Sequence, residues 1–333
     1  MELIHPRQAL FDDGENDSPL PVCDHYCGIE LRMRKSLQLQ GELGPVFDVT
    51  LDGEDGAPVG GEFEHAKLMA ELVNSPLNRF GRVGIRLQPV EHAAFERVVA
   101  SVVRDAGDKL AYLMLPKPAG LADLQRAVAV IDSASRDAGL ARAIPLHALV
   151  ETHGALREVD DLAAHPRIES LSFGVMDFVS AHRGAIPASA MSATGQFEHP
   201  LVLRAKLEIS AACHAHGKTP SHCVVTEFND LSALHAAATK ASRQLGYTRM
   251  WSIHPAQVRV IVDAFAPDAG EVELAADILM AAQRAGWAPV RHRDTLHDRA
   301  SYRLFWQRLQ RAHHAARAGD VRLPPEVTQA FFS

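Results

Sequence analysis

The sequence lacks several features that would place the protein in a specialised class. Its 333 residues contain only four cysteines, too few and too irregularly spaced for a disulfide framework in a chain of this size. No stretch approaches the roughly 20 apolar residues of a membrane span, and the N-terminus lacks the charged-then-apolar pattern of a signal peptide. We therefore expect reduced thiols, no membrane partner and a cytoplasmic protein.

Long basic runs are also missing. The 34 Lys and Arg residues are outnumbered by 41 Asp and Glu residues, which gives a net charge of −7 with histidine neutral. This composition argues against nucleic acid as a partner, because proteins that bind nucleic acid neutralise phosphates with clustered basic side chains. An anionic ligand would have to bind in a local basic pocket.

The signatures of three common site types are absent. Residues 25–30, which form the turn after the first expected strand, contain no G-x-G-x-x-G, and this argues against nicotinamide binding of the Rossmann kind. Ser252 does not lie in a G-x-S-x-G segment, so a serine-hydrolase triad has no support. The cysteines do not form the close C-x₂-C pairs of structural zinc sites.

What the sequence does contain is a repeated alternation of short apolar runs with longer segments of helical spacing. Eight such units follow Pro19, and a hydrophobic content of 47% is enough for a sizeable core. Eight parallel strands alternating with helices over about 250 residues predict a (β/α)₈ TIM barrel, which we place at residues 20–267. The expected strands are 20–27, 46–51, 82–87, 111–115, 149–154, 171–177, 221–226 and 249–253.

Two segments fall outside the expected barrel. Residues 1–19 are polar and acidic, and we expect them to form a flexible N-terminal arm. Residues 268–333 show helical spacing over 272–285 and 299–317 and no strand pattern. We expect them to form a C-terminal helical extension, a lid or oligomerisation element that packs on its own barrel or on that of a neighbouring subunit.

Polar side chains gather where the expected strands end, which in a TIM barrel is the face that carries the active site. The unusual number of charged groups at this face predicts a binding or catalytic site. The candidates, in chain order, are Asp52, Glu54, Asp55, Arg86, Lys117, Glu151, Asp177 and His254.

Glu151 and Asp177 each follow an apolar run at the end of one of two neighbouring strands. Mg²⁺ is commonly held by one or two protein carboxylates and keeps water and substrate in its other positions. The pair is therefore a candidate magnesium site. Carboxylates also occur at strand ends for local hydrogen-bonding reasons, and the sequence alone leaves the two interpretations equally open.

Arg86 lies between Ile85 and Leu87 in an otherwise apolar strand. A structural arginine would need a buried carboxylate partner there, and Glu54 and Asp55 are one strand away. A functional arginine would direct its planar fork at a substrate carboxylate or at a developing enolate oxygen.

Lys117 and His254 give less specific signals. Lys117 lies on a stiff loop between two prolines and is either an anion contact or an exposed lysine. Its position at a strand end makes it a weak candidate for a Schiff-base aldolase. His254 could act as a base, but we favour a histidine that fixes the last loop by a hydrogen bond.

Taken in order, these motifs resemble the aldolase/citrate lyase family, which includes the β subunit of citrate lyase and the malyl-CoA lyases. The resemblance runs over about residues 20–312. The segments that carry it are Leu51–Ala57, Gly84–Gln88, Leu115–Lys117, Val150–Thr152, Phe173–Phe178 and Ser252–Gln257.

The resemblance implies a Mg²⁺-dependent carbon–carbon lyase that acts next to a carboxylate or thioester, usually as a homotrimer or homohexamer. It makes Glu151 and Asp177 the magnesium ligands. It makes Arg86 the group that binds the substrate carboxylate and stabilises an enolate, supported by Glu54 and Asp55. Lys117 and His254 are further candidate substrate contacts.

The substrates that the resemblance implies are an acyl-CoA thioester and a 2-oxo acid such as glyoxylate, oxaloacetate or pyruvate. Two alternatives stay open, a CoA-independent 2-oxo-acid aldolase and a non-catalytic metabolite-binding barrel. Three features depart from the family pattern and leave the substrate open: Gln88, the segment 178–184 and the turn 23–28.

Asp298 is the candidate general base. The segment Leu296–Asp298 resembles the part of the family in which an aspartate of the C-terminal lid, often from a neighbouring subunit, reaches over the barrel mouth. An aspartate at the start of a helix is also an ordinary cap, and the two interpretations carry equal weight.

Overall fold

The computed structural model describes residues 4–11, 20–57, 59–316 and 322–333. The contacts of the chain divide it into two compact units. One unit is Pro21–Phe265, and the other joins the N-terminal residues up to Leu20 with Ala266–Ser333.

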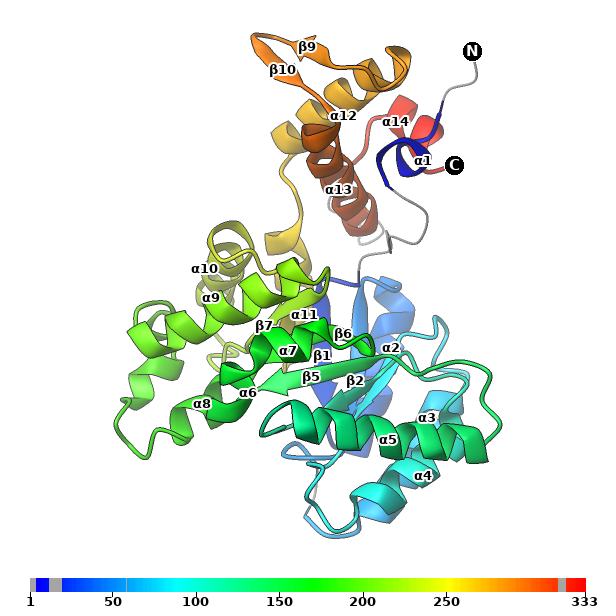
Figure 1. Cartoon of the computed structure of the whole chain (residues 1–333), viewed down its shortest axis with the longest axis vertical. Coiled ribbons are helices and arrows are strands. Elements are labelled where there is room, and N and C mark those ends of the chain that lie inside the picture. The colour runs from blue at the N-terminus through cyan, green and yellow to red at the C-terminus, as the bar shows by residue number, and fades with distance from the viewer. Residues whose placement is uncertain (1–3, 12–19, 58, 317–321) are drawn as a thin grey trace. The chain divides into compact units, whose positions relative to one another are not determined.

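The first unit is a closed barrel of eight parallel strands, arranged around the barrel in sequence order (Figure 1). Pairing of β1 with β8 closes it. The TIM barrel predicted from the sequence is thus confirmed. The strands are β1 Cys23–Cys27, β2 Phe47–Asp52, β3 Val83–Arg86, β4 Leu113–Leu115, β5 Leu146–Val150, β6 Ile168–Phe173, β7 Thr219–His222 and β8 Arg249–Ser252.

Helices of amphipathic pattern connect the strands. In α4, for example, Phe95, Val98, Val99 and Val102 recur at helical spacing and are all buried, whereas Arg104 is exposed. The helices are α2 Glu30–Leu43, α3 Glu62–Asn74, α4 Phe95–Ala106, α5 Leu121–Asp137, α6 His153–Arg157, α7 Val159–Ala164, α8 Val175–Ser180, α9 Pro200–Ala215, α10 Leu231–Gln244 and α11 Pro255–Phe265, with short 3₁₀ helices η1 Ala188–Met191 and η2 Gly195–Phe197.

The sixth strand differs from its prediction. The sequence predicts a strand over 171–177, but β6 ends at Phe173 and the next apolar residues form α8. A short apolar run fits a buried strand and a buried helix equally well, so periodicity could not separate the two. Asp177 consequently lies in the first turn of a helix and not at the end of a strand.

A buried set of ion pairs lies in the barrel interior near the amino ends of the strands. Arg249, the first residue of β8, is fully buried and contacts Asp48 at 2.6 Å and Asp24 at 3.1 Å. Thr50 and Tyr112 donate further hydrogen bonds to Asp24, at 2.6 Å and 3.0 Å. We call Asp24, Asp48 and Arg249 the inner ion-pair layer.

The second unit is mainly helical and has its own apolar core. Its elements are α1 Pro6–Leu10, α12 Ala269–Arg284, β9 Val290–His292, β10 Thr295–His297, α13 Arg299–Ala316 and α14 Pro325–Phe331. The core includes Leu10, Trp287, Tyr302, Trp306 and Phe331. None of the helices in the described ranges is both long and apolar enough to cross a membrane.

Two parts of the helical unit differ from the sequence prediction. The strands β9 and β10 form an antiparallel hairpin where no strand was predicted. Residues 4–11 belong to the segment predicted as a flexible arm, but Pro6–Leu10 within it form α1, which packs into the core through Leu10. The Trp287 indole also donates a hydrogen bond to the carbonyl of Ile4 at 3.0 Å. Residues 1–3 and 12–19 of that segment lie outside the described ranges.

Candidate active site

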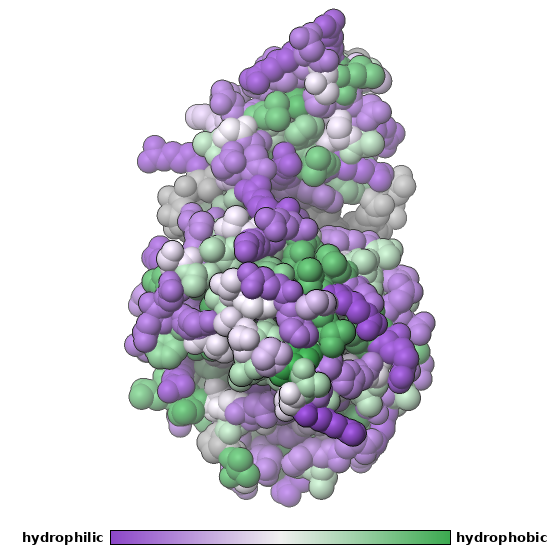
Figure 2. All heavy atoms as spheres, turned by 90° about the vertical axis from the view of Figure 1, so that its left-hand side faces the viewer, coloured by the Kyte–Doolittle hydropathy of each residue, from purple (hydrophilic) through white to green (hydrophobic). Residues whose placement is uncertain are grey.

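A cavity of about 690 Å³ opens at the carboxyl ends of the barrel strands. Figure 2 shows the face toward which the β5 arrow of Figure 1 points, and there hydrophobic side chains form a patch that is bordered by hydrophilic ones. Among the sequence candidates, those that line this cavity are Asp52, Asp55, Arg86, Glu151, Asp177 and His254.

Arg86 is held mainly by Asp52, because the register of β2 and β3 places these two residues side by side. The Arg86 Nε and Nη2 atoms donate to the two carboxylate oxygens of Asp52 at 2.6 Å and 2.5 Å, and Nη1 lies 3.1 Å from Glu54. Burial acts to lower the pKa of Arg86, but Asp52 and then Glu54 raise it further, so the guanidinium stays charged. The sequence named Glu54 and Asp55 as partners, and the principal one is Asp52.

The turn after β2 is built around the same Asp52 carboxylate. Its oxygens accept hydrogen bonds from the backbone amides of Glu54 and Gly56, each at 2.9 Å. A side chain at position 56 would place its Cβ 2.2 Å from an Asp52 oxygen, so only glycine fits there. Asp52 therefore fixes both the arginine and the loop that carries Glu54 and Asp55.

The ammonium of Lys117 links three carboxylates at the barrel mouth. It lies 2.5 Å from Glu54, 2.8 Å from Asp55 and 3.5 Å from Asp177, while the backbone amide of Lys117 donates to Glu151 at 2.8 Å. Burial acts to lower the pKa of Lys117, but the contacts with Asp55 and Glu54 outweigh it and raise the pKa. A permanently charged ammonium does not suit Schiff-base chemistry, which needs the neutral amine.

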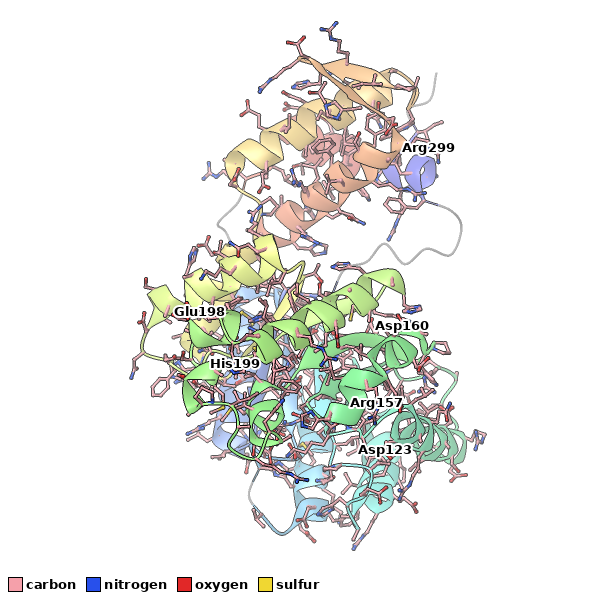
Figure 3. The ribbon with its side chains drawn as sticks, turned by 60° about the vertical axis from the view of Figure 1, so that its left-hand side comes forward. Asp123, Arg157, Asp160, Glu198, His199 and Arg299 are labelled. Atoms are coloured by element: carbon pink, nitrogen blue, oxygen red, sulfur yellow. The ribbon has the colours of Figure 1, made fainter. Side chains whose placement is uncertain are left out.

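The backbone around Lys117 is fixed on both sides. Lys117 has a φ of 48°, a left-handed conformation that needs support from its surroundings. Thr152 donates to the carbonyl of Pro118 at 2.8 Å, and the amide of Ala119 donates to Asp123 at 2.7 Å. Figure 3 labels Asp123 near the start of α5. These contacts aim the Lys117 amide at Glu151.

Glu151 and Asp177 form an unequal pair. Glu151 is only 3% exposed, and burial, followed by repulsion from Asp177, raises the pKa of its carboxyl to about 8. A Cβ on Gly174 would lie 2.2 Å from an Oε atom of Glu151, so the glycine provides the room for this carboxylate. The Asp177 side chain is 41% exposed.

Among the charged side chains at the barrel mouth, negative charge exceeds positive charge. Two cations face five carboxylates, and a buried carboxylate without a cation is costly. No group of three or more metal-binding side chains of the His, Cys, Asp and Glu types occurs in the described ranges. A hydrated Mg²⁺ ion needs only one or two protein carboxylates. The cations are Arg86 and Lys117, and the carboxylates are Asp52, Glu54, Asp55, Glu151 and Asp177.

His254 is exposed at the cavity, and its ring lies 5.6 Å from that of Phe228. The loop after β8 is held chiefly by Gln257, whose side-chain oxygen accepts from the amides of Ile253 and His254 at 2.9 Å and 3.3 Å. The Nδ1 atom of His254 accepts one further bond, from the amide of Ala256 at 3.3 Å. The glutamine therefore contributes more to fixing this loop than the histidine does.

Asp298 belongs to the helical unit. Its carboxylate accepts a hydrogen bond from the amide of Ala300 at 3.1 Å at the start of α13, so it caps this helix. Its action as a base stays a prediction.

Sequence reasoning gave no role to several residues that line the cavity, among them two cations and a pair of aromatic residues. Arg32 and Lys35 are exposed cations on α2, and their spacing of three on a helix places them on one face. Tyr26 and Trp251 stack with ring centroids 4.5 Å apart, and Tyr26 also lies 5.5 Å from the Arg86 guanidinium. The spacing of Arg32 and Lys35 was a usable signal, whereas the aromatic pair depends on the closure of β1 against β8.

Comparisons with known proteins agree with the fold and with the family that the motifs resemble. The profile of the HpcH/HpaI aldolase/citrate lyase family matches residues 48–255. An L-malyl-CoA/β-methylmalyl-CoA lyase from Cereibacter sphaeroides is 26% identical over 250 residues, which are 71% of this chain and 77% of the relative.

Among solved structures, a citrate lyase from Burkholderia xenovorans LB400 is 53% identical, with a TM-score of 0.85 over 98% of this chain and 100% of the other. Protein CitE from Mycobacterium tuberculosis, in complex with magnesium, acetoacetate and coenzyme A, has a TM-score of 0.66 over 90% of this chain and 99% of the other. Its 18% identity indicates a shared fold only.

Proposed function

The chain belongs to the HpcH/HpaI aldolase/citrate lyase family, and on this premise we propose that it is a Mg²⁺-dependent carbon–carbon lyase that interconverts a 3-hydroxyacyl-CoA thioester with an acyl-CoA and a 2-oxo acid. The observation that carries the proposal is the cluster of charged side chains at the barrel mouth. There a rigid arginine fork stands beside a cluster of carboxylates that is short of positive charge.

Glu151 and Asp177 are the residues that would hold magnesium. Their oxygens are the ligand type that Mg²⁺ prefers, and the surplus of carboxylates fits a divalent cation. When bound, magnesium would polarise the oxo group of the 2-oxo acid and offset negative charge. The backbone amide of Lys117 orients Glu151, and the Lys117 ammonium holds Glu54 and Asp55 beside Arg86.

In the cleavage direction, the proton of the C3 hydroxyl is removed and the bond between C2 and C3 breaks. The C3 oxygen becomes the carbonyl of the released 2-oxo acid, and the electron pair of the broken bond passes into an enolate of the thioester. Arg86 is fixed by Asp52 before substrate arrives, so its positive charge meets the developing oxyanion without reorganisation. A proton returned to C2 completes the acyl-CoA.

Arg32 and Lys35 support a thioester of coenzyme A over a free acid. Both line the cavity from α2, and their positive charge complements phosphate groups. Retention of the protein on immobilised coenzyme A separates a lyase that acts on a CoA thioester from an aldolase that acts on a free acid. We expect retention by the native protein and its loss in the Arg32→Ala/Lys35→Ala variant, and retention of neither would favour the CoA-independent aldolase.

An assay of malyl-, citramalyl- and citryl-CoA with and without Mg²⁺ tests the proposed function. We expect turnover of at least one thioester, dependent on Mg²⁺ and abolished by a chelator. A lack of metal-dependent turnover with all three would count against the lyase. Titration of Mg²⁺ together with a 2-oxo acid then tests the non-catalytic barrel, because an enzyme of this kind binds the two cooperatively.

We further propose that Asp298 returns the proton at C2 and that the protein acts as a trimer or hexamer. Loss of a general base costs roughly 10²–10⁴-fold in rate, whereas loss of a helix cap leaves the rate per folded molecule nearly unchanged. Asp298→Asn, measured where it stays folded, separates these outcomes. If its rate falls, activity recovered on mixing it with Glu151→Gln places the two residues on different subunits.

A further inference from the structure

The mouth of the barrel has two unlike sides. The charged residues follow β2 to β5, with Asp177 on α8. The segments that follow β6, β7 and β8 expose three large apolar side chains, Met176 in α8, Phe228 and Ile253, which are 52%, 50% and 42% exposed. All three line the cavity that also holds Arg86. We call these three side chains the apolar rim.

The apolar rim continues inward to the arginine. Phe173, Val224 and Trp251 line the same cavity and are 0%, 6% and 8% exposed, so they form its inner wall. Trp251 stacks on Tyr26, which lies 5.5 Å from the Arg86 guanidinium. Apolar residues therefore line the cavity both at its opening and beside the group that we assign to the reacting oxygen.

The loops that carry the apolar rim are held in place. Gln257 accepts the amide of Ile253 at 2.9 Å, and the ring of Phe228 packs 5.6 Å from His254. Asp230, two residues after Phe228, caps α10. Its carboxylate accepts a hydrogen bond from the amide of Ala233 at 2.9 Å. Exposure of large apolar side chains is unfavourable in water, and a fixed cluster of them beside a cavity indicates a ligand surface.

We propose that the apolar rim binds an apolar substituent of the 2-oxo acid, so that the enzyme prefers 2-oxo acids with a branched or extended carbon chain over glyoxylate. This inference rests on the proposed function. The carboxylate and oxo oxygen of the acid belong at the charged side, beside Arg86, Glu151 and Asp177. A carbon chain on the oxo carbon would displace water from those charged groups, whereas it gains favourable contact at the apolar rim.

Met176 supports this assignment to the 2-oxo acid. It is the neighbour of Asp177 in α8, and both line the cavity, so an acid bound at Asp177 has an apolar side chain of the rim beside it. A glyoxylate, which has only hydrogen on its oxo carbon, would leave the rim uncovered.

The test is a condensation assay with acetyl-CoA, Mg²⁺ and a series of acids: glyoxylate, pyruvate, 2-oxobutanoate, 2-oxopentanoate and 4-methyl-2-oxopentanoate. The CoA-ester product is quantified by chromatography. We expect kcat/KM to rise about fourfold for each added methylene that the rim covers. Highest kcat/KM for glyoxylate, with a fall at each added carbon, would overturn the inference and leave the lyase standing. Absence of product with every acid would refute the proposed function itself.

Phe228→Ser supplies a second test, with Phe80→Ser as its matched control. Phe80 is 40% exposed and is not among the residues that line the cavity. We expect Phe228→Ser to lower the ratio of kcat/KM for 4-methyl-2-oxopentanoate to that for glyoxylate about tenfold. Phe228→Leu should restore the ratio in part, and Phe80→Ser should leave it as in the native enzyme.

Other occupants of the apolar rim give different results. If the rim binds the coenzyme, Phe228→Ser lowers kcat/KM by the same factor for every acid, and the ratio stays constant. If a second copy of the chain covers the rim, the variant changes the oligomeric state seen by light scattering and again leaves the ratio constant. A constant ratio in a folded variant would overturn the inference.

Discussion

The barrel interior contains two arginines that are each held by carboxylates from neighbouring strands, and they differ in what surrounds them. Arg249 is fully buried between Asp24 and Asp48, near the amino ends of the strands. Arg86 lies at the carboxyl ends, is 7% exposed and lines an open cavity beside Asp52.

The two ion pairs differ in how far the surrounding protein groups balance their charges. At the inner ion-pair layer, the carboxylates of Asp24 and Asp48 are balanced by the two cations Arg249 and Arg82, and Thr50 and Tyr112 donate further hydrogen bonds to Asp24. At the mouth, the carboxylates outnumber the cations, and one of them, Glu151, is buried with a raised pKa. Carboxylates that are not balanced by protein cations and that lie next to a cavity can bind a cationic ligand.

The largest effect should come from the uncompensated carboxylates. We expect Glu151→Gln to remove Mg²⁺ binding and to lower turnover on the order of 10³-fold or more, with little loss of fold. Asp177→Asn should act in the same direction. Isothermal titration of Mg²⁺ with a 2-oxo acid and a turnover assay measure both effects. Glu91→Gln, at an exposed carboxylate paired with Arg126, is the control, and full metal-dependent turnover in Glu151→Gln would contradict the assignment.

The inner ion-pair layer should affect stability instead. Arg249→Met leaves two buried carboxylates without their shared cation and should lower the free energy of unfolding by about 3–5 kcal/mol. Urea denaturation measures the free energy of unfolding. If Arg249→Met does not fold, Arg249→Lys is measured in its place. Arg82→Met is the matched control, because Arg82 pairs with Asp48 at 28% exposure and its loss should cost less. If the two variants lost equal amounts of unfolding free energy, the fully buried Arg249 would contribute no more to stability than the partly exposed Arg82, which would contradict the prediction.

A substitution that keeps the charge tests the comparison most directly. Arg86→Lys retains a cation for Asp52 but loses the planar fork that makes two parallel contacts. We expect kcat to fall about 10²-fold while the protein stays folded, because the buried pair keeps both of its charges. If Arg86→Lys instead lowers stability as Arg249→Met does, with kcat per folded molecule unchanged, Arg86 is structural.

The smallest effect concerns pH. Burial lowers the pKa of His147, which is fully buried beside Glu169 at 3.1 Å. The unfolded chain therefore takes up a proton below about pH 6.5 that the folded state resists, and stability is lost as the pH falls through that value. His147→Gln should reduce this loss of stability between pH 7.5 and 5. Thermal melts measure it, with the exposed His235→Gln as control, and parallel curves for the native and His147→Gln proteins would contradict the prediction.

The barrel and most of the mouth could be predicted from the sequence. Strand and helix periodicities alternate regularly, and a carboxylate after a buried strand can be recognised without a structure. Glu151, for instance, directly follows β5 and accepts the Lys117 amide. A strand end fixes the height of a side chain in the barrel, which is why the sequence could bring these residues to one face.

What the sequence could not provide was lateral pairing. Asp52 became the partner of Arg86 through the register of β2 against β3, and register depends on packing across the sheet. The hairpin of β9 and β10 has three-residue strands, too short for an alternating pattern to be visible. Helix α1 was missed for a similar reason, because its five residues carry only one fully apolar anchor, Leu10.

The place of α1 has a consequence for how the protein is made. Its core partners, α12 to α14, are encoded at the far end of the chain, after the whole barrel. Domains fold as units while synthesis proceeds from the N-terminus at roughly 5–20 residues per second, so the barrel can close while α1 still lacks the helices that bury Leu10. The helical unit is thus the last part to mature. Premature termination of translation would release a closed barrel with an unassembled N-terminal helix.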